Sequence, residues 1–124
     1  MEILVLLLFL QVKHWYADFK IQTYQQTVRK GIFGDLVGIS HSLDHMWTSI
    51  VALLIYSLFF SFISLPLIIV TVFVEGIIHY TIDYVKVHYG CKDNTKPLFW
   101  NQFGLDQLAH QATYLAMVAV LLHI

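Results

Sequence analysis

The sequence predicts an all-α integral membrane protein, a four-helix bundle with up-down-up-down topology, and three observations lead to this fold class. Of the 124 residues, 58% are hydrophobic and 12% are charged, whereas an ordinary soluble domain is about 25% charged. Two polar stretches, residues 25–38 and 89–101, separate apolar segments of helical length. Residues with metal-ligating side chains recur four positions apart in these segments. Together, these patterns indicate one transmembrane domain, residues 1–124, with a polar site between its helices.

The first helix is expected over residues 2–24. Its first ten residues are apolar apart from Glu2. A basic n-region is missing, and no small-residue cleavage pattern follows, so we interpret the segment as a retained transmembrane helix instead of a signal peptide. The apolar part alone is too short to cross a bilayer. We therefore expect the helix to continue through His14 and Asp18, with Lys13 and Lys20 reaching the interface.

The other three helices are separated by recognisable loop and turn signals. Residues 25–38 are polar, contain three glycines and indicate a connection with room for a short interfacial helix. Pro66 marks a sharp turn, because proline is well tolerated in the first turn of the helix that follows. Residues 89–101 combine glycine, proline and charged residues, which is typical of a surface loop. The helices are expected over residues 40–65, 66–88 and 105–124.

The positive charges predict how the bundle is oriented. All seven Lys and Arg residues lie at or beside the two polar loops. The positive-inside rule therefore places both loops in the cytoplasm and both termini on the opposite side. At a rise of about 1.5 Å per residue, the candidate histidines of the first, third and fourth helices lie roughly 17–21 Å from the far side, and His45 about 30 Å. A helix tilt is needed to bring His45 to the level of the others.

Nine side chains form the candidate metal site near the cytoplasmic side. Glu75, His79 and Asp83 recur every four residues and form one polar stripe on a helix. A carboxylate at the centre of a membrane helix costs about 2.5–3.5 kcal/mol on insertion scales, so these groups should face the bundle interior. Polar packing between helices, without a metal, is the alternative interpretation. The same spacing joins the remaining candidates, His14 with Asp18, His41 with His45, and Asp106 with His110.

Five imidazoles and four carboxylates suit one or two divalent metal ions. Cysteine ligation is not expected, because Cys91 is the only cysteine. Nitrogen and oxygen ligands are compatible with zinc as the first choice and with manganese or iron as alternatives. Glu75, the deepest acid, is the candidate general base that takes a proton from a metal-bound water. Four further side chains are expected to contact the ligands or the substrate: Gln22, Lys86, Gln107 and Gln111.

The function predicted from these residues is a metal-dependent hydrolase that acts at the cytoplasmic face on a lipid or lipid-linked substrate. A membrane di-iron oxidative enzyme could use the same ligands. A proton or cation channel or transporter, or a metal that only stabilises the bundle, are further alternatives. The far halves of the helices carry almost no ionisable groups beyond Glu2 and His123, which favours a closed site over a channel. No basic tract suggests a nucleic-acid partner, and the small size is compatible with a homo-oligomer.

Three sequence blocks also resemble a known family. They are His14-Trp-Tyr-Ala-Asp18-Phe with Gln22, Glu75-Gly-Ile-Ile-His79-Tyr-Thr-Ile-Asp83, and Asp106-Gln-Leu-Ala-His110-Gln111. In this order they are similar to an uncharacterised family of small multi-pass membrane proteins from bacteria and their phages. The resemblance spans nearly the whole chain and implies a protein of the bacterial inner membrane. It supports the same site residues and implies no particular reaction. The ligand types and topology are more loosely similar to small membrane-bound metal-dependent hydrolases.

Overall fold

The computed structural model describes residues 1–123, which form five α-helices and one π-helix. Within these residues there is no β-strand, so the all-α prediction is confirmed. The elements are α1 (Glu2–Trp15), the π-helix η1 (Tyr16–Ile21), α2 (Tyr24–Arg29), α3 (Leu36–Phe59), α4 (Leu65–Tyr89) and α5 (Pro97–Leu121).

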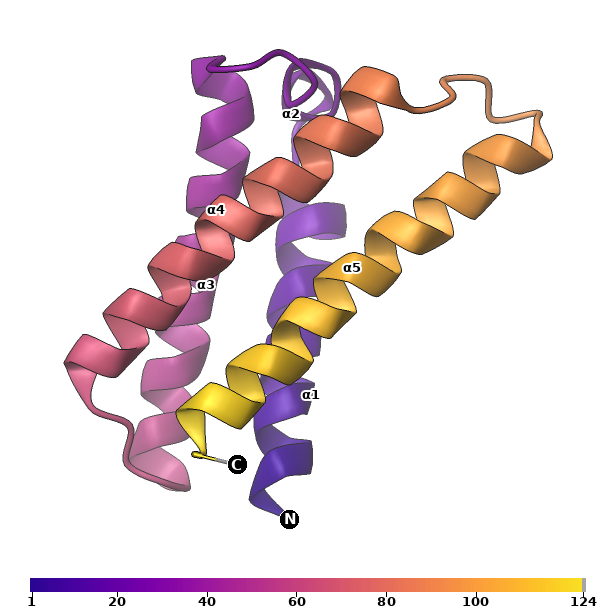
Figure 1. Ribbon diagram of the computed structural model, residues 1–124. Helices are drawn as coiled ribbons and strands as arrows, with labels where there is room; N and C mark the ends of the chain where they lie inside the picture. Colours follow the sequence, from indigo (N-terminus) through magenta and orange to yellow (C-terminus); the bar gives the residue numbers. More distant parts are fainter. Residues whose placement is uncertain (124) are drawn as a thin grey trace.

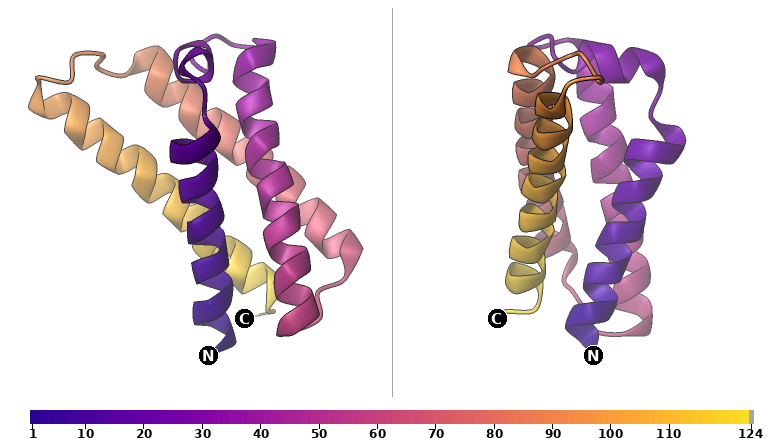
Figure 2. Two further views of the ribbon diagram at one scale, coloured as in Figure 1. Left: turned by 180° about the vertical axis from the view of Figure 1, so that it is seen from behind. Right: turned by 90° about the vertical axis from the view of Figure 1, so that its right-hand side faces the viewer.

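The four long helices pack as two crossed layers. Helices α1 and α3 form one layer and α4 and α5 the other, as the right-hand view of Figure 2 shows. Each helix contacts one partner within its layer and one in the other layer, because α1 packs on α3 and α5 while α4 packs on α3 and α5. Helices α4 and α5 lean across the more upright α1 and α3 (Figure 1). Met1 and the end of α5 lie at one end, and α2 and the α4–α5 loop lie at the other.

The bundle interior is apolar at the end where the chain begins and polar towards the loops. The apolar half is a cluster of buried residues that includes Leu6, Leu53, Ile68, Val72 and Val118. On each helix, the buried histidines and most of the buried acids lie closer to the loop end than the residues of this cluster do. This segregation places a polar interior next to the loops that carry α2 and residues 90–96.

The first helix differs from the prediction of a single helix over residues 2–24. Helix α1 ends at Trp15, and the π-helix η1 follows directly and ends at Ile21. The backbone then leaves helical geometry at Gln22, where φ is −58° and ψ is 125°. The cause is a capping box at the start of α2. The Thr23 hydroxyl accepts a hydrogen bond from the Gln26 backbone N–H, and the Gln26 side chain accepts one from the Thr23 N–H. This reciprocal cap favours a new helix start at this point.

Two other helices begin earlier than predicted. Helix α3 starts at Leu36 instead of residue 40, because the Asp35 side chain accepts hydrogen bonds from the N–H groups of Val37 and Gly38. Aspartate in this position is a strong N-cap. Helix α5 starts at Pro97 instead of residue 105, which places the proline in the first turn, where its missing N–H is not needed.

Helix α2 folds back onto the start of α3. The Gln26 amide donates to Ser40 Oγ at 3.1 Å and to Asp44 Oδ2 at 2.8 Å. Gly38 permits the close approach, because a Cβ atom there would lie 2.8 Å from the Lys30 Cα atom. This packing carries the Lys30 side chain into the polar half of the bundle, where it is 6% exposed.

Helices α3 and α4 are long and apolar enough to cross a membrane. Their most apolar windows have mean hydropathies of 1.3 and 1.9, respectively. Many of their large apolar side chains are exposed on the outside of the bundle, among them Leu58 at 80% and Val70 at 61%.

Candidate metal centre

Asp18 is the first point at which the histidines converge. Its Oδ1 atom lies 2.9 Å from His45 Nε2 and 3.1 Å from His41 Nε2. Its Oδ2 atom lies 3.2 Å from His14 Nε2. The carboxylate comes from η1, and the imidazoles come from α1 and α3. π-Helical turns are rare and occur frequently at functional sites.

Asp83 of α4 is the second point of convergence. Its Oδ2 atom lies 3.2 Å from His79 Nε2 and 3.3 Å from His41 Nε2, and its Oδ1 atom lies 3.6 Å from His110 Nε2. His110 also faces Asp106 Oδ1 at 3.5 Å. Because His41 reaches both Asp18 and Asp83, the two groups form one continuous cluster.

Helical spacing and helix tilt together produce this cluster. Residues four apart lie on one helix face, which brings His79 beside Asp83 on α4 and Asp106 beside His110 on α5. The His45 ring of α3 stacks on the His79 ring of α4 with centroids 3.6 Å apart. His45 therefore reaches the level of the other imidazoles in a bundle whose helices are tilted relative to one another (Figure 1).

The cluster is buried and its hydrogen bonding is incomplete. The five imidazoles are at most 3% exposed: His14, His41, His45, His79 and His110. Among residues 1–123, three buried side-chain atoms of the cluster have neither a hydrogen-bond nor a lysine partner, namely His79 Nδ1, Asp106 Oδ1 and His110 Nε2, while Asp83 Oδ2 has only the ion pair with Lys30 Nζ at 3.0 Å. A buried polar group without a partner costs roughly 1–3 kcal/mol. A cation in this region would bind the free oxygen of Asp106 and the Nε2 atom of His110.

The spacing of the donor atoms fits a metal ion. Ligands 2.0–2.2 Å from a tetrahedral zinc lie about 3.3–3.6 Å apart, and octahedral geometry shortens this to about 3.0 Å. Two groups of ligand atoms lie within 4.8 Å of one another: Asp18, His41, His45 and His79, and then His79, Asp83 and His110. Within them, the Nε2 atoms of His41 and His79 are 3.4 Å apart. Each group has the composition and size of a metal site, and His79 is common to both.

A second set of side chains orients these ligands. Tyr114 OH lies 2.9 Å from His14 Nδ1, and Gln107 Oε1 lies 3.1 Å from His14 Nε2. Gln22 Nε2 lies 2.7 Å from His41 Nε2. The Tyr114 contact is to the ring nitrogen that faces away from the carboxylates, and contacts of that kind fix the ring orientation of metal-binding histidines, whereas the two glutamines contact the Nε2 atoms that face the carboxylates. The sequence-predicted neighbours Gln22 and Gln107 therefore contact the cluster, whereas Gln111 hydrogen bonds to Gln11.

Three lysines pair with the acids of this region. Lys86, a predicted neighbour, lies 3.3 Å from Asp106 Oδ2. Lys30 Nζ lies 3.0 Å from Asp83 Oδ2. Lys13 forms an ion pair with Glu75, and both residues are buried, at 5% and 1% exposure.

Sequence reasoning did not find the roles of Lys13 and Lys30. Lys13 could have been found, because it lies inside an apolar segment at a depth similar to that of Glu75, which needs a buried partner. The fold-back that buries Lys30 has a weaker signal, the capping box at the start of α2.

Glu75 stands apart from the two groups of ligand atoms. One carboxylate oxygen pairs with Lys13, and the other accepts a hydrogen bond from Ser49 Oγ at 2.5 Å. The ion pair approaches the cluster through Lys13, whose Nζ atom lies 3.4 Å from His45 Nδ1. The structure thus brings together eight of the nine predicted ligands and places Glu75 beneath them.

Comparison with known proteins identifies a family. No curated protein and no solved structure matches the chain significantly. The sequence model of a family described as "Protein of unknown function (DUF3307)" matches residues 3–124, which is nearly the whole chain. The protein therefore belongs to the DUF3307 family.

Proposed function

We propose that this protein is an integral membrane metalloprotein that hydrolyses a lipid or lipid-linked substrate at the cytoplasmic face of the bacterial inner membrane. The observation that carries the proposal is the convergence of five buried imidazole Nε2 atoms on the carboxylates of Asp18, Asp83 and Asp106. The donors come from all four long helices and from η1. Imidazole and carboxylate ligands suit zinc, manganese or iron.

Membrane insertion is supported by the apolar exterior. Large apolar side chains are exposed along each long helix, for example Leu8 on α1, Leu54 on α3, Phe73 on α4 and Leu115 on α5. Continuous apolar surfaces of this kind need a hydrophobic environment. The helical stretch of α1 and η1 covers residues 2–21, about 30 Å at 1.5 Å per residue, which matches the bilayer core. The positive charges at the loop end favour a cytoplasmic location for the loops.

Charge balance favours a single ion in the resting centre. Three of the four acids pair with lysines, and only Asp18 has none among the described residues. With neutral histidines, the region then carries one net negative charge. One divalent ion with a bound hydroxide makes it neutral, whereas a second ion would leave excess positive charge in a medium of low dielectric constant, which is costly. A second ion therefore requires an anionic substrate.

The group of Asp18, His41, His45 and His79 is the better site for that ion, because it offers four ligands. A tetrahedral zinc bound by all four would have no position for water. Hydrolysis therefore requires either that His79 leaves the ion or that the ion has five or six ligands, as manganese and iron allow. The ion would lower the pKa of a bound water and so supply a hydroxide nucleophile at neutral pH.

Asp83 is better placed than Glu75 to act as the general base. Its Oδ2 atom lies within 3.3 Å of two members of the four-ligand group, and Lys30 Nζ lies 3.0 Å from the same oxygen. Both oxygens of Glu75 are engaged by Lys13 and Ser49. We therefore assign proton transfer to Asp83 and a charge-compensating role to Glu75.

The channel alternative has less support. A proton or ion pathway needs polar groups across the whole membrane. On the terminal side of the Lys13–Glu75 pair, the described interior is a cluster of packed apolar residues that includes Leu10, Leu53 and Val72. This packing favours a site that opens to one side only.

Incorporation of water oxygen into lipid products tests the hydrolase assignment. A mixture of lipids is used, so that no single substrate has to be known. We expect the metal-bound protein in detergent to transfer 18O from labelled water into products of a bacterial lipid extract, detected by mass spectrometry. Asp83→Asn should lower this rate by about 100-fold or more, the usual contribution of a general base. Asp93→Asn is the matched control, because Thr95 hydrogen bonds lower the pKa of Asp93 and keep it charged in an exposed loop. An unchanged rate in Asp83→Asn, or no incorporation by metal-bound wild type, would refute the assignment.

A further inference from the structure

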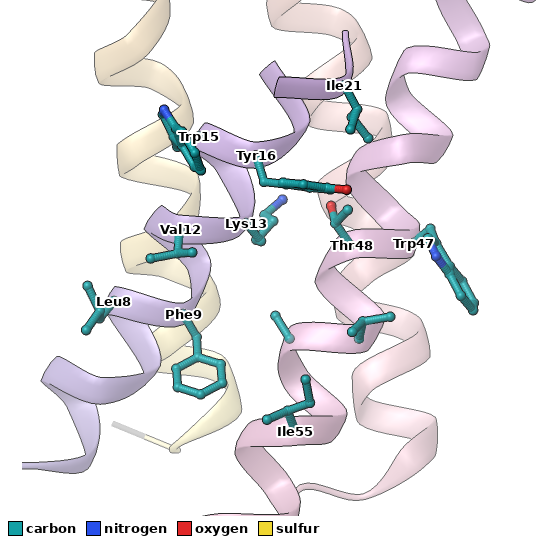
Figure 3. Close-up of a pocket in the computed structure, with 12 residues that line it drawn as sticks. Leu8, Phe9, Val12, Lys13, Trp15, Tyr16, Ile21, Trp47, Thr48 and Ile55 are labelled. Carbon is teal, nitrogen blue, oxygen red and sulfur yellow. The ribbon is translucent and has the colours of Figure 1, made fainter. Parts of the chain in front are cut away.

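A groove between α1 and α3 opens onto the outside of the bundle. It has a volume of about 590 Å³. Figure 3 shows side chains from both helices facing one another along it. Its walls are largely apolar and include Leu8, Phe9, Val12, Val51, Ala52 and Ile55.

The polar groups of the groove lie towards its cytoplasmic end. Tyr16 and Thr48 approach each other there, with Lys13 between the two helices (Figure 3). Lys13 is the only charged residue among those that line the groove. A lining of this kind, apolar along its length and polar at one end, matches an amphiphile with a long chain.

Lys13 connects the groove to the candidate metal centre. Its ammonium group pairs with Glu75 and lies 3.4 Å from His45 Nδ1, while His45 Nε2 is 2.9 Å from Asp18 Oδ1. An ammonium group has three N–H donors. Glu75 and His45 take two of these donors, and the buried Tyr114 ring lies 4.7 Å from Nζ, so a ligand in the groove would compete with this ring for the third donor.

We propose that this groove binds a hydrocarbon chain of an anionic membrane lipid and directs the polar end of that lipid past Lys13 to the metal centre. The inference rests on the proposed function, because it names the class of lipid and its route to the site. The groove volume of 590 Å³ lies within the range of about 300–1,000 Å³ that is typical of small-molecule sites.

A hydrocarbon chain needs no hydrogen-bond partner, which suits the largely apolar lining of the groove. Its walls are helices, whose backbone groups are already paired, so they present no edge to which an extended peptide could hydrogen bond.

Photo-crosslinking to the protein tests the groove. The probe is phosphatidic acid with a diazirine on one acyl chain, added to metal-bound protein in detergent, with labelled residues mapped by mass spectrometry. We expect saturable labelling of residues that line the groove. Ala52→Phe fills its floor and should lower labelling about tenfold, as expected when room for two methylenes is lost. Ile55→Phe, where the native side chain is 41% exposed, is a second variant in case Ala52→Phe does not fold.

Ile77→Phe is the matched control for Ile55→Phe, since Ile77 is exposed on α4, away from the groove. It should not change labelling. Equal labelling of the wild type and the folded groove variants, or labelling spread over all exposed apolar residues, would overturn the groove proposal. Metal content is measured in the same samples. Metal without groove labelling refutes the groove alone, and groove labelling without metal refutes the metal centre alone.

A competition experiment tests the contact with Lys13. Unlabelled phosphatidic acid should compete about tenfold better than phosphatidylcholine, the effect of one favourable charge contact. This preference should disappear in the double variant Lys13→Met/Glu75→Gln, which removes both charges of the buried pair together. A preference that persists in the double variant would overturn the role of Lys13.

Discussion

The His79→Ala variant is expected to lose most of its bound metal while the helical bundle remains folded. His79 belongs to both groups of ligand atoms, and its ring stacks on His45 at a centroid distance of 3.6 Å. Loss of a group that only orients a ligand already weakens metal binding by about 10–100-fold, so loss of a ligand should weaken it at least as much. Metal content after dialysis, measured by elemental analysis, reports the effect.

His123→Ala is the matched control for this change, because His123 is exposed and lies two residues beyond the end of α5. It should retain the full metal content. Circular dichroism of both variants separates metal loss from unfolding. If His79→Ala folded and kept as much metal as His123→Ala, His79 would not be a ligand.

The Lys13→Met variant is expected to be strongly destabilised. Lys13 and Glu75 form a buried ion pair with side-chain exposures of 4% and 1%. Removal of one partner leaves an uncompensated buried charge, which costs about 3–5 kcal/mol of unfolding free energy. Reversible denaturation in mixed micelles, or the thermal midpoint, measures the loss.

The double variant Lys13→Met/Glu75→Gln separates the ion pair from the size of the side chains. It removes both charges, so it should recover most of the stability that Lys13→Met loses. Ser49 can still donate a hydrogen bond to the glutamine side-chain oxygen. A single variant as stable as the double variant would show that Lys13 does not compensate Glu75.

Much of the candidate site could be predicted from spacing alone. Ligand-type residues four apart on a helix lie on one face, and an apolar sequence requires that polar face to point inwards. This reasoning led to His79 with Asp83 and to Asp106 with His110, which the structure brings within 3.5 Å of each other.

Partner choice between helices could not be predicted in the same way. The spacing of Glu75 matches that of His79 and Asp83, yet Glu75 meets Lys13 and Ser49 instead of the ligand cluster. Which of these three α4 residues reaches Lys13 depends on how α4 crosses α1 and α3. Crossing angles arise from side-chain packing.

Local capping signals explain the remaining differences in the fold. The Thr23–Gln26 capping box and the Asp35 cap are visible in the sequence, but their strength had to be weighed against apolar continuity. In the structure, new helices start at both caps, and the segment between the caps folds back as α2. The position of Lys30 over Asp83, at 3.0 Å, follows from that fold-back.

The most direct test of the account is elemental analysis of the wild-type protein, purified in detergent without added metal and without a chelating tag. We predict about one zinc, manganese or iron ion per chain, as the charge of the buried cluster favours. Iron would direct attention to the oxidative alternative, and zinc or manganese to hydrolysis. A folded protein that contains none of these metals, and takes up none on addition, would contradict the metal centre.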